Sequence, residues 1–257
     1  MNFTLDDWQP WYNKILETFG YDQCEDQRAA DLLSVLLDER AGNVAELREL
    51  IENRPVFVFG AGPSLEEDLK QVMKEGLLQK TVTIVADGAT TAFVQISGLA
   101  PNVIVTDLDG VICDIVYARS MGAIVVIHAH GDNIDKLTKY VPTFSKAVGS
   151  TQRHPRSNVY NFLGFTDGDR AVFLAAGMGA KLIALAGMDF GYTVGKYSKK
   201  QVASIDVKRK KLKIGKELLE WLAFETGEKI KLYNITFNGE TIKGFRNIKT
   251  ADLQNLI

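Results

Sequence analysis

The feature that most constrains the fold is an alternation of short apolar runs with helix-like stretches, which begins at Arg54-Pro55. The apolar runs are Val56–Phe59, Val82–Ala86, Val103–Thr106, Ile124–Ile127, Lys146–Val148, Val159–Leu163 and Leu182–Ala186. Most are apolar at consecutive positions, which is typical of strands buried on both faces of a parallel sheet. The helix-like stretches lie at about 65–75, 90–97, 111–120, 132–140 and 169–178. This order predicts a doubly wound α/β fold, with a mostly parallel sheet flanked by helices.

The two ends of the chain have a different pattern. Apolar residues recur at helical spacing as far as Ile51, so residues 1–52 are predicted to form a small helical N-terminal appendage. Residues 53–196 are then the α/β catalytic domain. Residues 197–257 are predicted to supply a basic segment, a C-terminal helix, a short strand at Lys231–Ile235 and a tail, all packed on the catalytic domain.

Composition excludes several classes of function. The formal net charge of −2 gives no overall attraction to nucleic acid or to an anionic membrane. No apolar run approaches the roughly 18 residues that span a bilayer, and Met1–Pro10 lacks the features of a signal peptide. We therefore expect a cytoplasmic protein that binds neither nucleic acid nor a membrane. Cys24 and Cys113 form no CxxC pair, which predicts reduced, buried thiols rather than a disulfide framework or a zinc finger.

Glycines and polar residues follow almost every predicted strand. Ligands of open α/β sheets bind beyond the carboxyl ends of the strands, where the strand order reverses. The strand ends carry Gly60-Ala61-Gly62-Pro63-Ser64, Asp87-Gly88-Ala89, Thr106-Asp107-Leu108-Asp109-Gly110, His128-Ala129-His130-Gly131-Asp132, Gly164-Phe165-Thr166-Asp167-Gly168-Asp169-Arg170 and Gly187-Met188-Asp189. The active site is expected to be built from these six motifs.

Asp107 and Asp109 carry the sharpest signal. Carboxylates two residues apart at a strand end can point into one site, and their oxygens are the ligands that Mg²⁺ prefers. Two close carboxylates repel one another, so a cation or a proton is needed between them. An Asx turn, the alternative, uses only one of the two. Asp87 ends the preceding strand and is predicted to join the metal site, although it can instead bind a ribose hydroxyl.

The segment Gly60–Ser64 joins a strand to a helix, so its main-chain N–H groups can approach a phosphate at the positive end of that helix. A plain turn is the alternative, and Ser64 with Glu67 also makes a capping-box pattern. Leu65 occupies the third glycine position of a dinucleotide fingerprint, so the match to that fingerprint is incomplete.

His128 and His130 lie on one side of a strand end, like a zinc pair. His154 is the only other histidine, and a three-histidine site would need it. Phosphate contact or proton handling is the favoured role for the pair, and Asp132 either takes part or caps the following helix.

Three further features suit a phosphorylated ligand. Asp167, Asp169 and Arg170 combine two acids with a guanidinium that can bind phosphate oxygens bidentately, or an Asp and the Arg form an exposed ion pair. Asp189 ends another strand, or belongs to a plain turn. The segment 196–216 contains eight further basic residues against Asp206 alone: Lys199, Lys200, Lys208, Arg209, Lys210, Lys211, Lys213 and Lys216. Such a segment is either a solvated face or a basic flap that neutralises a triphosphate.

These motifs, in this order, resemble the archaeal 6-hydroxymethyl-7,8-dihydropterin diphosphokinases, whose catalytic domain is similar to that of thiamine diphosphokinases. The resemblance covers roughly residues 50–225. In thiamine diphosphokinases an Asp-Gly-Gly-Ala stretch and a Gly-Asp-x-Asp-Ser stretch carry the metal site. Asp87-Gly88-Ala89 and Asp107-Leu108-Asp109 take their places here. The aspartates are retained and the glycine and serine are not, so the resemblance supports a metal site without thiamine specificity.

The resemblance implies Mg²⁺-dependent transfer of the β,γ-diphosphoryl group of ATP to the hydroxymethyl oxygen of a reduced pterin, with release of AMP. ATP and the pterin are then the partners, and a homodimer is a possible assembly. The implied metal ligands are Asp87, Asp107 and Asp109. The implied catalytic residues are Asp107, Asp109, Asp132, Asp169 and Arg170. The implied binding residues of the nucleotide or pterin cleft are Gly60, Gly62, Pro63, Ser64, Asp87, Gly88, His128, His130, Asp189 and Lys211.

Three other functions fit parts of the sequence. A group with related motifs resembles glycosyltransferases, which use a nucleotide-activated sugar. A non-catalytic nucleotide-binding module would use Trp8, Trp11 and Tyr12 as an interaction surface. A dehydrogenase would use Gly60 and Asp87 to bind NAD, but it would not explain the surplus of acids.

Overall fold

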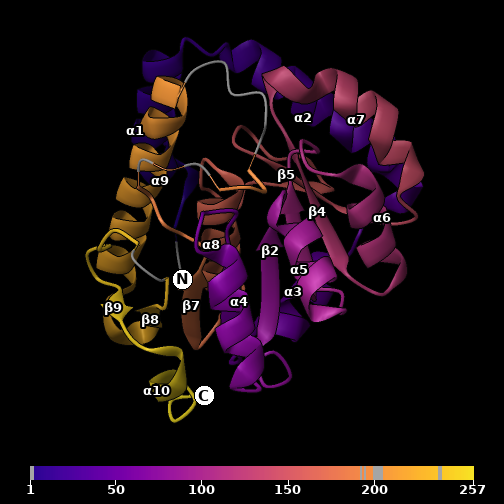
Figure 1. Ribbon diagram of the computed structural model, residues 1–257. Helices are drawn as coiled ribbons and strands as arrows, with labels where there is room; N and C mark the ends of the chain where they lie inside the picture. Colours follow the sequence, from indigo (N-terminus) through magenta and orange to yellow (C-terminus); the bar gives the residue numbers. More distant parts are fainter. Residues whose placement is uncertain (1–2, 192, 194, 199–204, 237–238) are drawn as a thin grey trace.

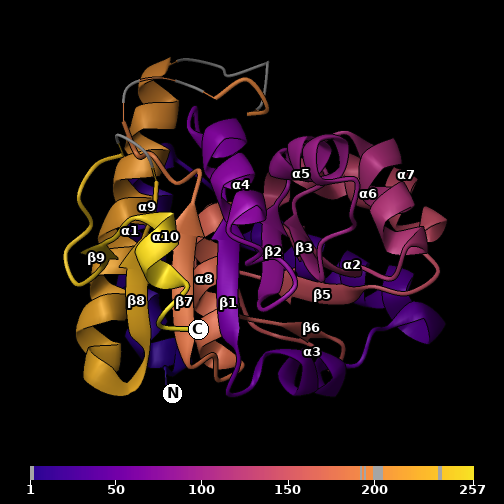
Figure 2. The same cartoon turned by 60° about the horizontal axis from the view of Figure 1, so that its bottom comes forward.

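The computed structural model describes residues 3–191, 193, 195–198, 205–236 and 239–257. Its centre is a single nine-stranded sheet (Figures 1 and 2). The strands are β1 (Pro55–Phe59), β2 (Val82–Ala86), β3 (Val103–Thr106), β4 (Ile124–Ala129), β5 (Val148–Thr151), β6 (Val159–Tyr160), β7 (Leu182–Ala186), β8 (Lys231–Asn234) and β9 (Arg246–Asn247). They lie in the order β6-β5-β4-β3-β2-β1-β7-β8-β9. Every pairing between neighbours is parallel.

The strand order reverses between β1 and β7, which are paired along their whole length. The first six strands extend the sheet in one direction from β1, and the last three extend it in the other. The predicted doubly wound α/β fold is therefore confirmed. The switch point between β1 and β7 is where ligands of such sheets bind.

Helices cover both faces of the sheet (Figure 2). The α-helices are α1 (Leu5–Phe19), α2 (Gln23–Leu37), α3 (Val44–Ile51), α4 (Leu65–Lys74), α5 (Ala89–Ser97), α6 (Ile112–Ser120), α7 (Ile134–Tyr140), α8 (Asp167–Gly177), α9 (Ile205–Thr226) and α10 (Thr250–Leu253). Short 3₁₀ turns include η2 (Gly131–Asn133). All five helix predictions between the strands are confirmed, and the observed starts and ends differ from the predicted ones by only one or two residues.

The central strands are buried on both faces because their side chains alternate between two hydrophobic clusters. Val56 and Val58 of β1 belong to the cluster under α8, α9 and α1. Phe57 and Phe59 belong to the cluster under α4 and α5. This two-sided burial is the reason why the strands are apolar at consecutive positions.

The structure corrects two predicted strands and adds two elements. The strand predicted at Lys146–Val148 is β5, which begins at Val148 and continues through a polar but buried end to Thr151. The strand predicted to reach Leu163 stops at Tyr160, and Leu163 itself adopts φ +62°, which is not an extended conformation. The polar tail, for which no element was predicted, adds β9 and α10.

The N-terminal helix α1 is part of the main core. Trp8 and Tyr12 are buried in the same cluster as the central strands, and Trp11 packs against that cluster. The interaction surface postulated for these aromatic residues is therefore wrong. The division of the chain at residues 52 and 196 stays a prediction.

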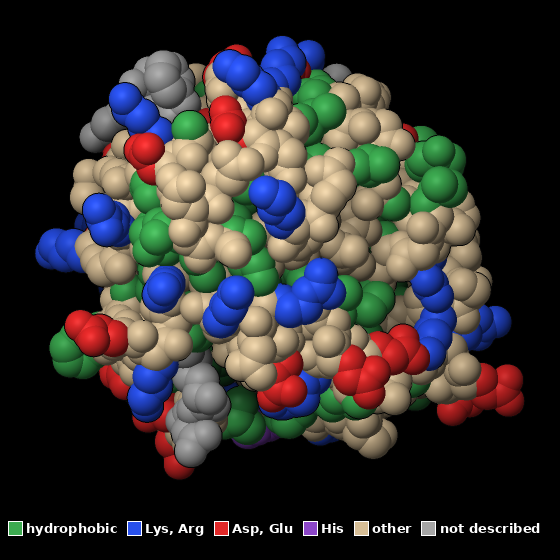
Figure 3. Space-filling model, turned by 90° about the horizontal axis from the view of Figure 1, so that it is seen from below, with side chains coloured by type: hydrophobic (Ala, Val, Ile, Leu, Met, Phe, Trp, Pro, Cys, Tyr) green, Lys and Arg blue, Asp and Glu red, His purple; other side chains and the backbone are tan. Residues whose placement is uncertain are grey.

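The structure also tests the predictions made from the cysteines and from the charge. Cys24 and Cys113 are free and exposed, so the prediction of buried thiols is wrong. Lys and Arg side chains are scattered among acidic ones on the face shown in Figure 3. No helix in the described part of the chain is long and apolar enough to cross a membrane.

Candidate active site

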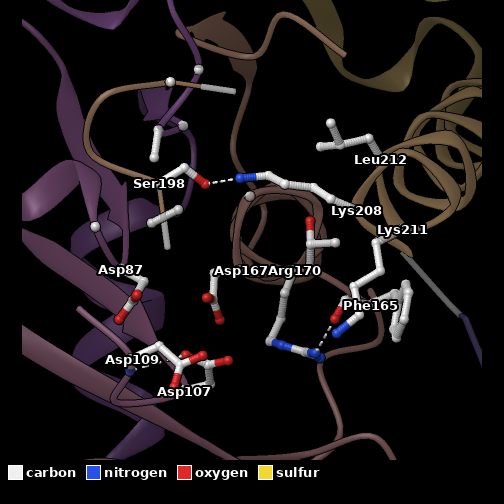
Figure 4. A pocket seen from close by; sticks show the side chains of 18 of the residues that line it. Asp87, Asp107, Asp109, Phe165, Asp167, Arg170, Ser198, Lys208, Lys211 and Leu212 are labelled. Atoms are coloured by element: carbon white, nitrogen blue, oxygen red, sulfur yellow. Dashed lines mark hydrogen bonds between the residues drawn. The ribbon is translucent and has the colours of Figure 1, made fainter. Parts of the chain in front are cut away.

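A cavity of about 610 Å³ opens at the carboxyl edge of the sheet (Figure 4). The ends of β1, β2, β3, β4 and β7, the start of α8, the first turns of α9 and the junction of α1 with α2 line it. The predicted residues in this lining are Gly60, Gly62, Pro63, Asp87, Gly88, Asp107, Asp109, His128, His130, Asp132, Arg170, Asp189 and Lys211. Ser64 and Asp169, although predicted, lie behind the wall of the cavity rather than in its lining.

Three carboxylates form an acidic triad in this cavity: Asp87 after β2, Asp107 after β3 and Asp167 at the start of α8. One oxygen from each lies within 4.8 Å of the other two, and all three side chains are partly buried. In the described part of the chain this is the only group of histidine, cysteine and acidic residues with the spacing of a metal site. Its all-oxygen composition suits Mg²⁺.

The electrostatics of the triad favour a bound cation. Burial, reinforced by the charge of Asp107, raises the pKa of Asp87 from 3.8 to about 7. Burial, with the charges of Asp107 and Asp87, raises the pKa of Asp167 well above its ordinary value. Desolvation and mutual repulsion both oppose ionisation. A divalent cation between the carboxylates would remove this opposition, as would protonation of one of them.

Asp87 is held in a strained position. Its φ of +28° is unusual for a residue with a side chain, and strain of this kind is concentrated at functional sites. The hydroxyl of Thr106 donates a hydrogen bond to its carboxylate. Gly110 packs against the same carboxylate, because an added Cβ would lie 3.0 Å from Asp87 Oδ1.

The carboxylates of Asp107 and Asp109 have different partners, and that of Asp109 pairs with Lys136. Leu108, between them, has φ +66°, and Asp107 Oδ1 accepts a hydrogen bond of 3.1 Å from the Asp109 N–H in an Asx turn. The left-handed residue breaks the two-residue alternation of an extended chain. The Asp109 carboxylate, with 3% of its side chain exposed, forms an ion pair with Lys136 of α7. Its role as a metal ligand stays a prediction, and the triad contains Asp167 instead.

The two acids at the start of α8 have separate tasks. Asp169 is fully buried, and its carboxylate accepts hydrogen bonds from the N–H groups of Phe165 (2.6 Å) and Thr166 (2.9 Å) and from the Thr166 hydroxyl. Thr166 and Asp169 thus make a capping box. The Thr-x-x-Asp pattern can be recognised in the sequence. It indicates that Asp169 caps the helix and that Asp167 is the acid available to the triad.

Arg170 is buried behind the triad. Its guanidinium donates to the carbonyl oxygens of Leu163 (3.2 Å), Gly164 (2.9 Å) and Phe165 (2.9 Å). Burial lowers its pKa, while Asp167 and Asp169 act in the opposite direction. These bonds fix the loop before α8. They commit both terminal nitrogens to the protein, so the predicted grip on phosphate stays a prediction.

The histidines do not assemble a zinc site. His154 is exposed on the loop after β5 and exchanges main-chain hydrogen bonds with the Gln27 side chain. His130 Nε2 lies 3.7 Å from Asp107 Oδ2, and His130 Nδ1 accepts a 3.2 Å hydrogen bond from the Asp132 N–H. Burial, with the charge of Arg170, holds the pKa of His128 well below 6.5.

The exposed Asp132 side chain lies 4.0 Å from His130 Nδ1. The neighbouring Asn133, which was not predicted, donates to the carbonyl oxygens of Asp107 (2.9 Å) and His128 (2.7 Å). It thereby ties the ends of β3 and β4 together.

The glycines after β1 allow close packing against β7. A Cβ on Gly60 or on Gly62 would overlap Gly187 and the residues that follow it. The N–H of Gly62 donates to Gly187 O at 2.8 Å. Ser64 makes no side-chain cap; its hydroxyl bonds Asp68 (2.9 Å) and Asp189 (3.0 Å) instead. Contact of this turn with a nucleotide stays a prediction.

Three lysines of α9 line the cavity, namely Lys208, Lys210 and Lys211. Figure 4 shows Lys208 and Lys211 on the side opposite the triad. Lys208 is hydrogen bonded to the Ser198 hydroxyl, and burial lowers its pKa. Lys211 Nζ lies between three aromatic rings, at 5.9 Å from Phe19, 5.5 Å from Tyr21 and 5.6 Å from Phe165. Lys199 and Lys200 lie outside the described residues.

The residues at the junction of α1 and α2 were missed by the sequence reasoning. Thr18, Phe19 and Tyr21 all line the cavity. No local pattern distinguishes them from core aromatic residues, because they reach the site only through the packing of α1 on α8 and α9.

The fold and the cavity define an α/β protein with an acidic pocket at the switch point of a parallel sheet, the architecture in which phosphorylated ligands bind. The chain belongs to the 6-hydroxymethylpterin diphosphokinase MptE-like family, whose model matches residues 33–195. Proteins named 6-hydroxymethyl-7,8-dihydropterin pyrophosphokinase are similar along nearly their whole length. The protein of Pyrococcus furiosus is 47% identical over 236 residues, which cover 90% of this chain and 99% of that protein.

Two further relatives carry the same name. The protein of Methanothermobacter thermautotrophicus is 44% identical, over 84% of this chain and 93% of its own length. The protein of Methanocaldococcus jannaschii is 43% identical, over 85% of this chain and 95% of its own length. The family resemblance inferred from the strand-end motifs is therefore confirmed.

Proposed function

We propose that this protein transfers the β,γ-diphosphoryl group of ATP to the hydroxymethyl oxygen of 6-hydroxymethyl-7,8-dihydropterin. In this reaction the pterin oxygen bonds to the β-phosphorus, the bond from that phosphorus to the α,β-bridging oxygen breaks, and AMP leaves with the bridging oxygen. The names of the three relatives support this acceptor and this chemistry. They favour diphosphoryl transfer over glycosyl transfer.

The observation that carries the proposal is the acidic triad. Asp87, Asp107 and Asp167 would hold Mg²⁺, and the raised pKa values of Asp87 and Asp167 show that their carboxylates are destabilised as anions without a cation. When bound, Mg²⁺ would neutralise phosphate oxygens and orient them for in-line displacement. Asp109, although it pairs with Lys136, lines the same cavity and stays a candidate for a second contact.

The chain's own groups would supply the remaining electrostatic stabilisation. The helices α4, α5 and α8 all begin at the carboxyl edge beside the cavity, so their positive ends face the space for the phosphates. Lys208 extends into the same space (Figure 4) and would bind the transferring group. The exposed carboxylate of Asp132 would accept the proton of the acceptor hydroxyl. A homodimer stays a prediction.

A direct assay tests the proposal. The purified protein with ATP, Mg²⁺ and the reduced pterin should yield AMP and the pterin diphosphate. Asp107→Asn should lower the rate of AMP formation by about 100-fold or more, because it removes a triad carboxylate that stabilises the transferring group. Thiamine in place of the pterin should give no product.

Asp135→Asn is the matched control. Asp135 is an exposed carboxylate of α7 outside the cavity lining, so this variant should keep the wild-type rate. Thermal unfolding of both variants would show that they are folded. Unchanged turnover in Asp107→Asn would overturn the metal assignment, and absence of AMP from the wild-type protein would overturn the proposed reaction.

A further inference from the structure

Three aromatic side chains form one wall of the cavity, which we call the aromatic cup: Phe19, Tyr21 and Phe165. The ring centroids of Phe19 and Tyr21 are 5.4 Å apart and those of Phe19 and Phe165 are 5.2 Å apart. All three residues line the cavity. The Lys211 ammonium lies over all three rings at 5.5 to 5.9 Å, which is within the range of a cation–π interaction.

The cup is fixed by the backbone around it. Gly20 ends α1 with φ +68°, and its N–H and that of Tyr21 both donate to Leu16 O. This left-handed turn sets Phe19 and Tyr21 side by side, and it favours glycine. Phe165 is held on both sides, because its N–H donates to Asp169 and its carbonyl oxygen accepts from Arg170. The three rings are therefore held in fixed positions at the wall of the cavity.

Two buried polar atoms of residues in the cavity lining have no hydrogen-bond partner in the described part of the chain. His128 Nε2 and Arg170 Nε have no hydrogen-bond partner among the described residues, although both residues are at least 98% buried. Both residues line the cavity, as does Gln152. An unsatisfied buried polar atom is costly. A ligand with a hydrogen-bonding edge would remove that cost, whereas an apolar ligand would not.

Phe165 of the cup lies across the cavity from Asp87 and Asp107 (Figure 4). Polar groups at the ends of β4 and β5 line the same cavity, namely His128, His130 and Gln152. Helix α1 is tied to this edge of the sheet, because Trp8 donates to Gln152 O at 2.9 Å.

We infer that the aromatic cup, with His128 and Arg170 at its edge, binds the flat heterocycle of the acceptor, so that helix α1 is part of the active site. This inference rests on the proposed function. A reduced pterin combines a planar ring with an edge of hydrogen-bond donors and acceptors, which matches rings for stacking and unpartnered polar atoms for the edge.

Direct binding measurements test this assignment independently of turnover. The probes are 6-hydroxymethylpterin, followed by its fluorescence, and an ATP analogue with a methylene group in place of the α,β-bridging oxygen, added with Mg²⁺ and followed by calorimetry. Phe19→Ala and Tyr21→Ala should each raise the Kd for the pterin about ten-fold, because base–aromatic stacking has that order of effect. The Kd for the nucleotide analogue should not change.

Two control variants accompany the test. Tyr21→Phe keeps the ring and should bind the pterin as the wild type does. Phe224→Ala removes an aromatic ring of α9 that is 82% exposed and should change neither Kd. Weaker binding of the nucleotide analogue with unchanged pterin binding would assign the cup to adenine, and unchanged binding of both probes would remove any role for it. Both results overturn the inference.

The inference and the proposed function fail in different ways. A wild-type protein that forms pterin diphosphate, while the cup variants keep the wild-type Kd and KM for the pterin, overturns the inference alone. A wild-type protein that binds the pterin through the cup but forms no AMP overturns the proposed reaction and supports the cup as a pterin site.

Discussion

Replacing Asp87 with asparagine should stabilise the metal-free protein at neutral and alkaline pH. The pKa of Asp87 is raised from 3.8 to about 7 in the folded protein. Between these two values the folded state binds more protons than the unfolded state, so the free energy of unfolding falls as pH rises through this window. This loss of unfolding free energy is small below about pH 4 and complete above about pH 7. Asparagine cannot ionise, and it keeps the acceptor oxygen for the Thr106 hydroxyl.

The size of the effect follows from the pKa shift. A rise from 3.8 to about 7 corresponds to about 4 kcal/mol at roughly 1.36 kcal/mol per unit. Partial exposure of the carboxylate reduces this, so we expect Asp87→Asn to gain about 2 kcal/mol at pH 8. For a chain of this size that is about 4 to 8 °C in Tm. At pH 3.5 the difference should be small, because Asp87 is then mostly protonated in both states of the wild type.

The assay is thermal or urea unfolding of the wild type and of Asp87→Asn at pH 3.5, 5 and 8 in the presence of a chelator. Mg²⁺ added at pH 8 should stabilise the wild type more than the variant, because binding to the folded state raises stability by mass action. Asp135→Asn should show neither effect. The reasoning would be refuted if the stability of the wild type and of Asp87→Asn had the same pH dependence. It would also be refuted if the variant were the less stable of the two at pH 8.

Two further substitutions test structural roles. Asp169→Asn should lower the free energy of unfolding by about 2 kcal/mol, measured by urea unfolding, because one oxygen that accepts from Phe165 or Thr166 becomes an amide donor; an unchanged urea midpoint would contradict the capping role. Gly62→Ala should cost about 2 kcal/mol or more by the same measurement, because its Cβ would overlap Asp189; Gly177→Ala, where a Cβ would meet nothing, should be neutral.

The strands and helices of the central domain were predictable because their signals are local. Each strand is a short apolar run bounded by glycine or a charged residue, and each helix follows it within a few residues. The strand predictions were wrong where polar residues are buried or where a strand is exposed. Ser150 and Thr151 are polar yet fully buried in β5, and β9 is two exposed residues that pair with β8.

The acidic site was predictable in kind and only partly in its members. Asp87 and Asp107 end neighbouring strands, so parallel pairing brings them together. Asp167 lies at the start of α8, a helix that packs on one face of the sheet. Which of Asp167 and Asp169 joins the triad depends on the capping box, because that motif uses Asp169. Asp109 has the right spacing, but Lys136, far along the chain, pairs with it.

The sequence by itself determined the doubly wound α/β class, the edge of the sheet where the site lies and the family, because these depend on periodicity and on short motifs at strand ends. Only the tertiary structure decided that Asp167 completes the triad and that Phe19 and Tyr21 of α1 line the cavity. Asp167 is 60 positions from Asp107 and 80 from Asp87, and Phe19 is 146 positions from Phe165. Their meeting depends on the packing of α1, α8 and α9 around the sheet, which no local pattern encodes.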